Sequence, residues 1–134
     1  MIDKKRYLAK IIALDNEGLQ IVSACCAGAK VKLSDIKYLK SNKIFLFSLK
    51  RKQIEKEKNK QIDSICKFDF VDQVKSKNIN QKIDDQMLEL LTIDYLKNKN
   101  DYEINLIFDK NRQIVLNTET IEIRLEDQTE IQEQ

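Results

Sequence analysis

Residues 8–28 read LAKIIALDNEGLQIVSACCAG, in which a short apolar run leads directly into a helical pattern. The run over residues 8–14 carries one charge and is too short for a good helix, so it predicts a largely buried strand. Asp15 follows at a helix N-cap position, where its carboxylate can accept amide protons that the first helical turn leaves unpaired. The stretch therefore predicts one strand followed by one helix.

The helical part of this stretch places its apolar residues on one face. Leu19, Val22 and Cys26 recur at positions i, i+3 and i+7. Gly28 stands where a left-handed residue commonly ends a helix. We expect one amphipathic helix near the N-terminus, over residues 16–27, which docks through its three apolar residues.

The rest of the chain alternates apolar segments with polar turns, which is typical of antiparallel sheets. Residues 36–49 predict a hairpin with a short turn at Ser41-Asn42. Residues 121–126 alternate between apolar and charged and favour a half-buried strand, with a short helix over residues 119–126 as the alternative. Further strands are expected at residues 65–70, 71–79, 87–96, 102–108 and 113–117.

Together these segments predict an α+β fold in a single domain, residues 1–134, with the helix packed on a bent, mostly antiparallel sheet of about seven to nine strands. The sheet could curl toward a barrel, and a pleckstrin-homology-like roll is one such form. Residues 50–60 are expected to form a charged, exposed loop and residues 127–134 a frayed acidic tail.

The composition of the chain excludes several kinds of site. Its 134 residues include no histidine and only two glycines, and the formal net charge is +2. Without histidine there is no Ser-His-Asp or Cys-His nucleophile system and no usual neutral-pH general base. Two glycines cannot supply a dinucleotide-binding or Walker phosphate loop. We therefore assign no catalytic residue, metal or cofactor, and the balance leans away from an enzyme.

The cysteines and the hydropathy pattern predict where the protein resides. The chain has an odd number of cysteines, Cys25, Cys26 and Cys66, and they form no C-x-x-C pair. No apolar segment approaches the length needed to span a membrane. With no signal peptide, we expect a cytoplasmic protein with reduced thiols and no membrane contact. Adjacent helix residues point about 100° apart, so packing explains Cys25-Cys26 better than a redox or metal site.

One charged segment carries a binding hypothesis. The residues that could contact a polyanion are Lys50, Arg51, Lys52, Lys56, Lys58 and Lys60. Glu55 and Glu57 dilute this charge, and no aromatic side chain is interleaved for base stacking. A solvated loop is the default interpretation, and binding to RNA or the ribosome is the alternative.

Two groups of residues follow the pattern of a known family. The first comprises Ala13-Leu14-Asp15, Glu17, Leu19, Val22-Ser23-Ala24, Asp35-Ile36, Tyr38-Leu39 and Phe45. The second comprises Leu90-Leu91-Thr92-Ile93, Leu106-Ile107-Phe108, Ile114, Leu116, Ile121-Glu122, Leu125 and Asp127. In these positions the chain resembles an alphaproteobacterial family, domain of unknown function family 2948. The chain departs from it at residues 109–112, where the family has a glycine-rich turn. The resemblance implies a bacterial cytoplasmic protein and supplies no activity, cofactor or catalytic residue.

These observations lead to three functional hypotheses. The first is a non-enzymatic module that binds a protein partner, or a second copy of itself, through an open sheet edge. The second is small-molecule binding or catalysis in a pocket of the curled sheet, with Tyr38, Tyr95 or Asp94 among its polar groups. The third is RNA or ribosome binding through residues 50–60, with a steep salt dependence. Nucleic acid is the less expected class of partner.

Overall fold

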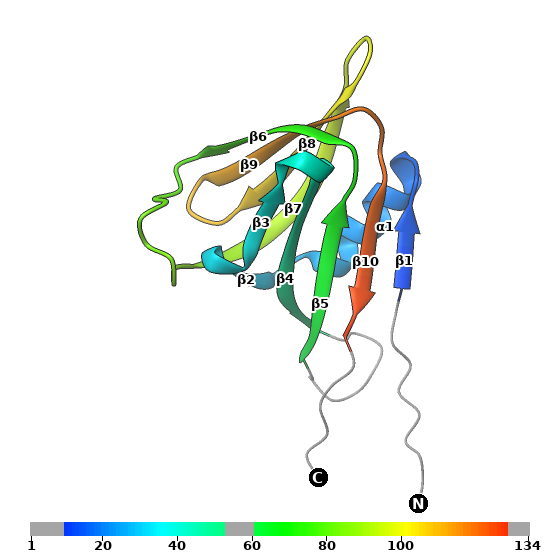
Figure 1. The fold of residues 1–134 in the computed structure, drawn as a ribbon. Coiled ribbons are helices and arrows are strands. Elements are labelled where there is room, and N and C mark those ends of the chain that lie inside the picture. Colours follow the sequence, from blue (N-terminus) through cyan, green and yellow to red (C-terminus); the bar gives the residue numbers. More distant parts are fainter. Residues whose placement is uncertain (1–9, 53–60, 129–134) are drawn as a thin grey trace, which may run out of the picture.

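The computed structural model describes residues 10–52 and 61–128, which form ten strands, one α-helix and two single-turn 3-10 helices (Figure 1). The helix is α1 (Asn16–Cys26), and the short turns are η1 (Leu33–Asp35) and η2 (Lys40–Asn42). The strands are β1 (Lys10–Ala13), β2 (Ala29–Lys32), β3 (Ile36–Leu39), β4 (Ile44–Lys52), β5 (Gln61–Phe68), β6 (Val71–Lys77), β7 (Met87–Lys97), β8 (Tyr102–Phe108), β9 (Arg112–Thr118) and β10 (Ile123–Asp127).

The strands form one sheet in which every described pairing is antiparallel. Their order is β1-β10-β5-β4-β2-β7-β8-β9-β6, and β3 pairs with β4 beside this path. The predicted α+β class with a mostly antiparallel sheet is confirmed. The described sheet is open, with β1 and β6 at its two ends, so it does not close into a barrel.

The described residues form ten strands, more than the seven to nine predicted, because no sequence pattern indicated β2. This strand is four residues long, and its alternation of buried Ala29 and Val31 with exposed Lys30 and Lys32 is too short to stand out. It pairs with the start of β7 on one side, and on the other its only paired position with β4 is Lys30 with Lys50.

The helix forms as the sequence predicts. The Asp15 carboxylate accepts a hydrogen bond from the N–H of Gly18 at 2.9 Å, which caps the first turn. Leu19, Val22 and Cys26 are the buried helix residues, and they pack into the same core as the strands. Gly28 has φ 84°, the left-handed backbone expected just beyond the helix end.

Helix α1 takes the place of a neighbouring strand along the second half of β7. The pairing of β2 with β7 ends at Leu90, and beyond it the N–H of Ile93 donates to the Ser23 hydroxyl at 2.9 Å. The same hydroxyl lies 3.2 Å from the Thr92 hydroxyl. A helix side chain thereby satisfies a backbone group that a further strand would otherwise pair.

We expect the Ser23→Ala variant to lose about 1–2 kcal/mol of unfolding free energy, because the Ile93 N–H is left without a partner in a partly buried place. Urea denaturation measures the loss, and hydrogen exchange at the Ile93 amide should accelerate. Gln20→Ala, on the exposed side of the helix, is the matched control and should change neither quantity appreciably. Equal effects of the two substitutions would contradict this assignment.

Three predictions about element ends require correction. The strand predicted over residues 8–14 to be largely buried is the edge strand β1, in which Ala13 is buried and Ile12 is exposed, as is Leu14 just beyond it. The short helix considered for residues 119–126 is wrong, since β10 pairs with β1 and β5. Strands β4 and β10 also run further than expected, so Lys50–Lys52 and Asp127 belong to the sheet, not to a loop and a tail.

Candidate binding groove

The predicted polyanion-binding residues do not gather into one site within the described structure. Lys50 and Lys52 are exposed on β4, and the Lys50 ammonium is 2.9 Å from the Asp63 carboxylate. Arg51, between them on the strand, points to the opposite face and is buried. The remaining three candidates, Lys56, Lys58 and Lys60, lie outside the described residues.

Arg51 is engaged in a buried ion pair that joins three strands. Its guanidinium donates to both Asp127 carboxylate oxygens at 2.9 Å, and Ser64 donates to the same carboxylate at 2.6 Å. Arg51 and Asp127 are each 7% exposed, and Ser64 is fully buried. The predicted role of Arg51 in polyanion binding is therefore replaced by a structural one, because its charge is already neutralised inside the protein.

The cysteines agree with a packing role. Cys26 on the helix and Cys66 on β5 are both buried in the core, and Cys66 interacts with Cys26. The hydrogen bond with Cys26, together with burial, raises the pKa of the Cys66 thiol well above its usual 9.0, which keeps the thiol protonated. Within the described residues, no group of three His, Cys, Asp or Glu side chains could hold a metal ion.

The tyrosines and the aspartate proposed for a pocket inside the sheet do not converge on one place. The Tyr38 hydroxyl donates to the Val71 carbonyl at 2.9 Å, and the Tyr95 ring lies against Tyr102 with centroids 6.1 Å apart. Asp94 is exposed. These contacts explain the two tyrosines as parts of the sheet.

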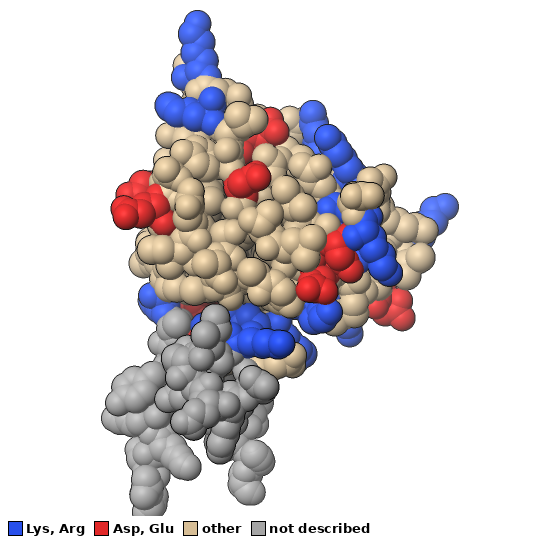
Figure 2. Space-filling model, turned by 180° about the vertical axis from the view of Figure 1, so that it is seen from behind, with Lys and Arg blue, Asp and Glu red and all other residues tan. Residues whose placement is uncertain are grey.

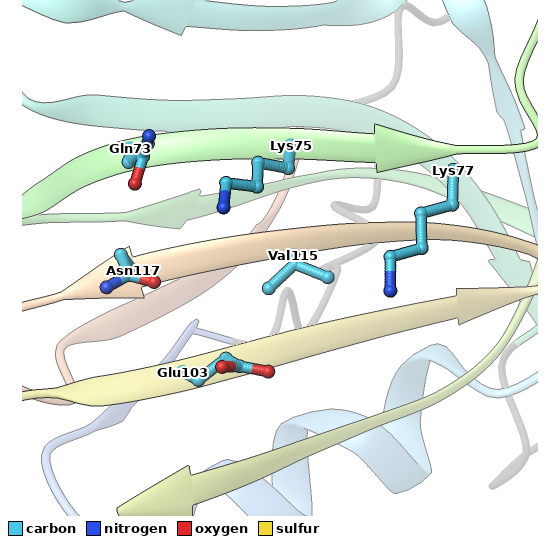
Figure 3. A pocket seen from close by; sticks show the side chains of 6 residues that line it. All are labelled: Gln73, Lys75, Lys77, Glu103, Val115 and Asn117. Carbon is cyan, nitrogen blue, oxygen red and sulfur yellow. The ribbon is translucent and has the colours of Figure 1, made fainter. Parts of the chain in front are cut away.

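A groove on the outer face of the sheet collects polar side chains from three adjacent strands (Figure 3). Its volume is about 200 Å³, and it lies on the face of β6, β9 and β8 that points away from the core. The lining residues are Gln73, Lys75 and Lys77 from β6, Val115 and Asn117 from β9, and Glu103 from β8.

Strand register explains why these side chains meet. Gln73 is paired with Asn117, which is paired with Glu103, so one row crosses all three strands. Lys75 is paired with Val115 in the next row. Since side chains two residues apart on a strand share a face, alternate residues of each strand contribute to the groove.

The groove has a positive side and a negative side. Within the described structure, the side chains of Lys75 and Lys77 make no hydrogen bond or ion pair; the Lys75 ammonium lies between β6 and β9, and the Lys77 side chain extends across β9 (Figure 3). Glu103 faces them from β8. In the reverse view, basic side chains with some acidic ones among them lie on the side where β6 and β9 are, while the centre of that face is mostly uncharged (Figure 2). The unpaired positive charges of the groove are therefore those of Lys75 and Lys77.

The sequence pattern did not predict this groove, although the alternation of residues 72–77 indicated part of it. Gln73, Lys75 and Lys77 alternate with Asp72, Val74 and Ser76, which places the two lysines on one face of a strand. The groove residues of β8 and β9 stand 26 to 44 positions later in the chain than those of β6. No local pattern indicates that pairing.

The fold and the groove define a class of protein: an open, ten-stranded antiparallel sheet with one helix and a polar groove on its outer face. Residues 9–134 match the family model described as "Protein of unknown function (DUF2948)", so the chain belongs to this family, as its residues suggested. No curated protein and no solved structure matches the chain. None of the described helices has the length and hydrophobicity needed to cross a bilayer.

Proposed function

We propose that the protein is a non-enzymatic binding module of the cytoplasm and that its partner is a polypeptide that docks in the groove over β6, β9 and β8. The observation that carries this proposal is the pair of uncompensated lysine side chains, Lys75 and Lys77, on the edge strand β6, which pairs with no strand on its outer side among the described residues. Exposed strand edges are recurrent docking sites for extended polypeptides.

The side chains that line the groove are better suited to binding a ligand than to catalysing a reaction. It is lined by amide, ammonium and carboxylate groups, with neither a nucleophile nor a base held by a third residue. Its apolar floor is limited to Val115, whereas small-molecule sites are mostly apolar and enclosed. A shallow polar surface beside a strand edge is consistent with a polypeptide ligand.

Site-specific photo-crosslinking in the native organism tests this proposal. A photo-reactive residue in place of Gln73, which is exposed at the groove, should yield one reproducible adduct with a polypeptide. The control carries the same probe in place of Ser48, which is exposed on β4 away from the groove. Adducts of equal yield at both positions, or none at Gln73, would show that the groove is not a docking site.

A further inference from the structure

We infer, building on the proposed function, that the occupant of the groove is an acidic, extended segment of a different protein that pairs with β6 as an additional strand. Three features of β6 carry this inference: its free edge, the spacing of its lysines and the repulsion that it would create against a second copy of itself.

The edge of β6 is open over most of its length. Its first residue, Val71, donates its N–H to the Lys43 carbonyl at 2.8 Å, which closes only that end. Among the described residues, no other backbone hydrogen bond reaches β6 from the side away from β9. Five of the remaining six residues are exposed, and only Val74 is partly buried. Between Gln73 and Lys77, an incoming strand would meet backbone groups that no other strand of the described residues pairs on that side.

The part of β6 that could pair with an added strand is short, and both of its ends are defined. The register of β6 against β9 shifts between Val71 and Gln73, so regular pairing begins at Gln73 and continues to Lys77. Five residues at about 3.3 Å each give a ladder of about 16 Å. The inferred ligand is therefore a segment of about five residues in an extended conformation.

Charge determines which side chains this segment carries. Lys75 and Lys77 lie two residues apart on the groove face, so alternate residues of an added strand would lie opposite them. Opposite charges in directly facing positions stabilise strand pairing, and like charges weaken it. Glu103 on β8 disfavours acidic groups deeper in the groove. These positions together favour two acidic residues separated by one residue, held close to β6.

The same lysines disfavour a second copy of this chain. An antiparallel self-pairing of β6 centred on Ser76 would place each Lys75 opposite a Lys77. Centring the pair on Lys75 would place the two copies of that lysine opposite each other. Lysines on an edge strand are a common means of preventing such association. The charge of β6 therefore favours pairing with an acidic strand and disfavours pairing with the β6 strand of a second copy.

Binding of a labelled synthetic peptide, Thr-Glu-Val-Glu-Val, to the full chain tests the inference. Backbone NMR shifts should change at residues 73–77 and at the facing β9 residues. Fluorescence anisotropy should give an affinity about three- to tenfold higher than for Thr-Gln-Val-Gln-Val at low salt. Methylating the peptide nitrogens that face β6 should abolish binding, while methylating the alternate nitrogens should not. Equal affinity of the two peptides, or equal tolerance of both methylation patterns, would overturn the inference.

Charge reversal provides the matched variants. Lys75→Glu together with Lys77→Glu should lose the preference for the acidic peptide and prefer one with lysine in place of glutamate. Lys37→Glu together with Lys52→Glu, on β3 and β4, changes the net charge equally outside the groove lining and should keep the original preference. If no peptide binds while the crosslink at Gln73 persists, this inference fails and the proposed function stands. A crosslink to a second copy of the chain would likewise overturn the inference alone.

Discussion

Replacing Asp127 with alanine is expected to lower the free energy of unfolding by about 3–5 kcal/mol. The substitution would leave the Arg51 guanidinium buried without its anion, since both carboxylate oxygens accept hydrogen bonds from it. It would also remove the acceptor of the Ser64 hydroxyl, which is fully buried. The loss of stability comes mainly from leaving the Arg51 charge buried without a counter-ion, rather than from the loss of one attractive contact.

Urea denaturation of three variants separates these contributions. Glu126→Ala removes a partly exposed carboxylate that lies 3.3 Å from the Lys10 ammonium, so it should cost at most about 1 kcal/mol. The double variant Arg51→Met with Asp127→Leu removes both charges and should recover most of the stability lost by Asp127→Ala. A loss below about 1 kcal/mol for Asp127→Ala itself would mean that the pair contributes little to the fold.

This ion pair also illustrates what the sequence could not supply. Arg51 and Asp127 are 76 positions apart, and each stands in a segment whose local charge pattern predicts exposure. Their burial follows from the register of β5 between β4 and β10, which places Asp127 beside Ser64. Charge patterns describe a segment in isolation, whereas burial of a charge depends on partners brought in by the fold.

Elements with strong local signals were predicted well. Helix α1 carries its own N-cap at Asp15 and its own apolar face, and the β3–β4 hairpin follows from two apolar runs around Ser41-Asn42. Strand β10 has a clean alternation of apolar and charged residues. Strand β2 and the groove lack such signals, because one is only four residues long and the other joins three strands through their register.

Replacing Arg112 with methionine is the second substitution for which we expect a large loss, about 2–4 kcal/mol. Arg112 is 8% exposed, and its guanidinium donates to the Gln86 side chain at 3.0 Å and to the Met87 carbonyl at 3.2 Å. It also bonds the Asp109 carboxylate and, at 3.1 Å, the Asp109 carbonyl. Methionine retains much of the apolar volume but leaves these acceptors without their donor.

The loss on replacing Arg112 should depend on pH, because one of those acceptors titrates. Burial by itself raises the pKa of the Asp109 carboxyl. The N–H of Glu89 and the Arg112 guanidinium outweigh it, so the pKa lies below its usual 3.8. A lowered folded-state pKa stabilises the protein above the unfolded-state value, and this stability is lost as the pH falls through the folded-state value.

The difference in stability between the natural chain and Arg112→Met should therefore be largest near neutral pH and shrink as the pH falls below about 4. Urea midpoints measured between about pH 7 and pH 3 give this difference directly. Lys99→Met, in another turn and exposed, is the control and should track the natural chain at every pH. A large difference that stays constant down to pH 3 would assign the effect to the two carbonyls and Gln86, with the Asp109 charge contributing nothing.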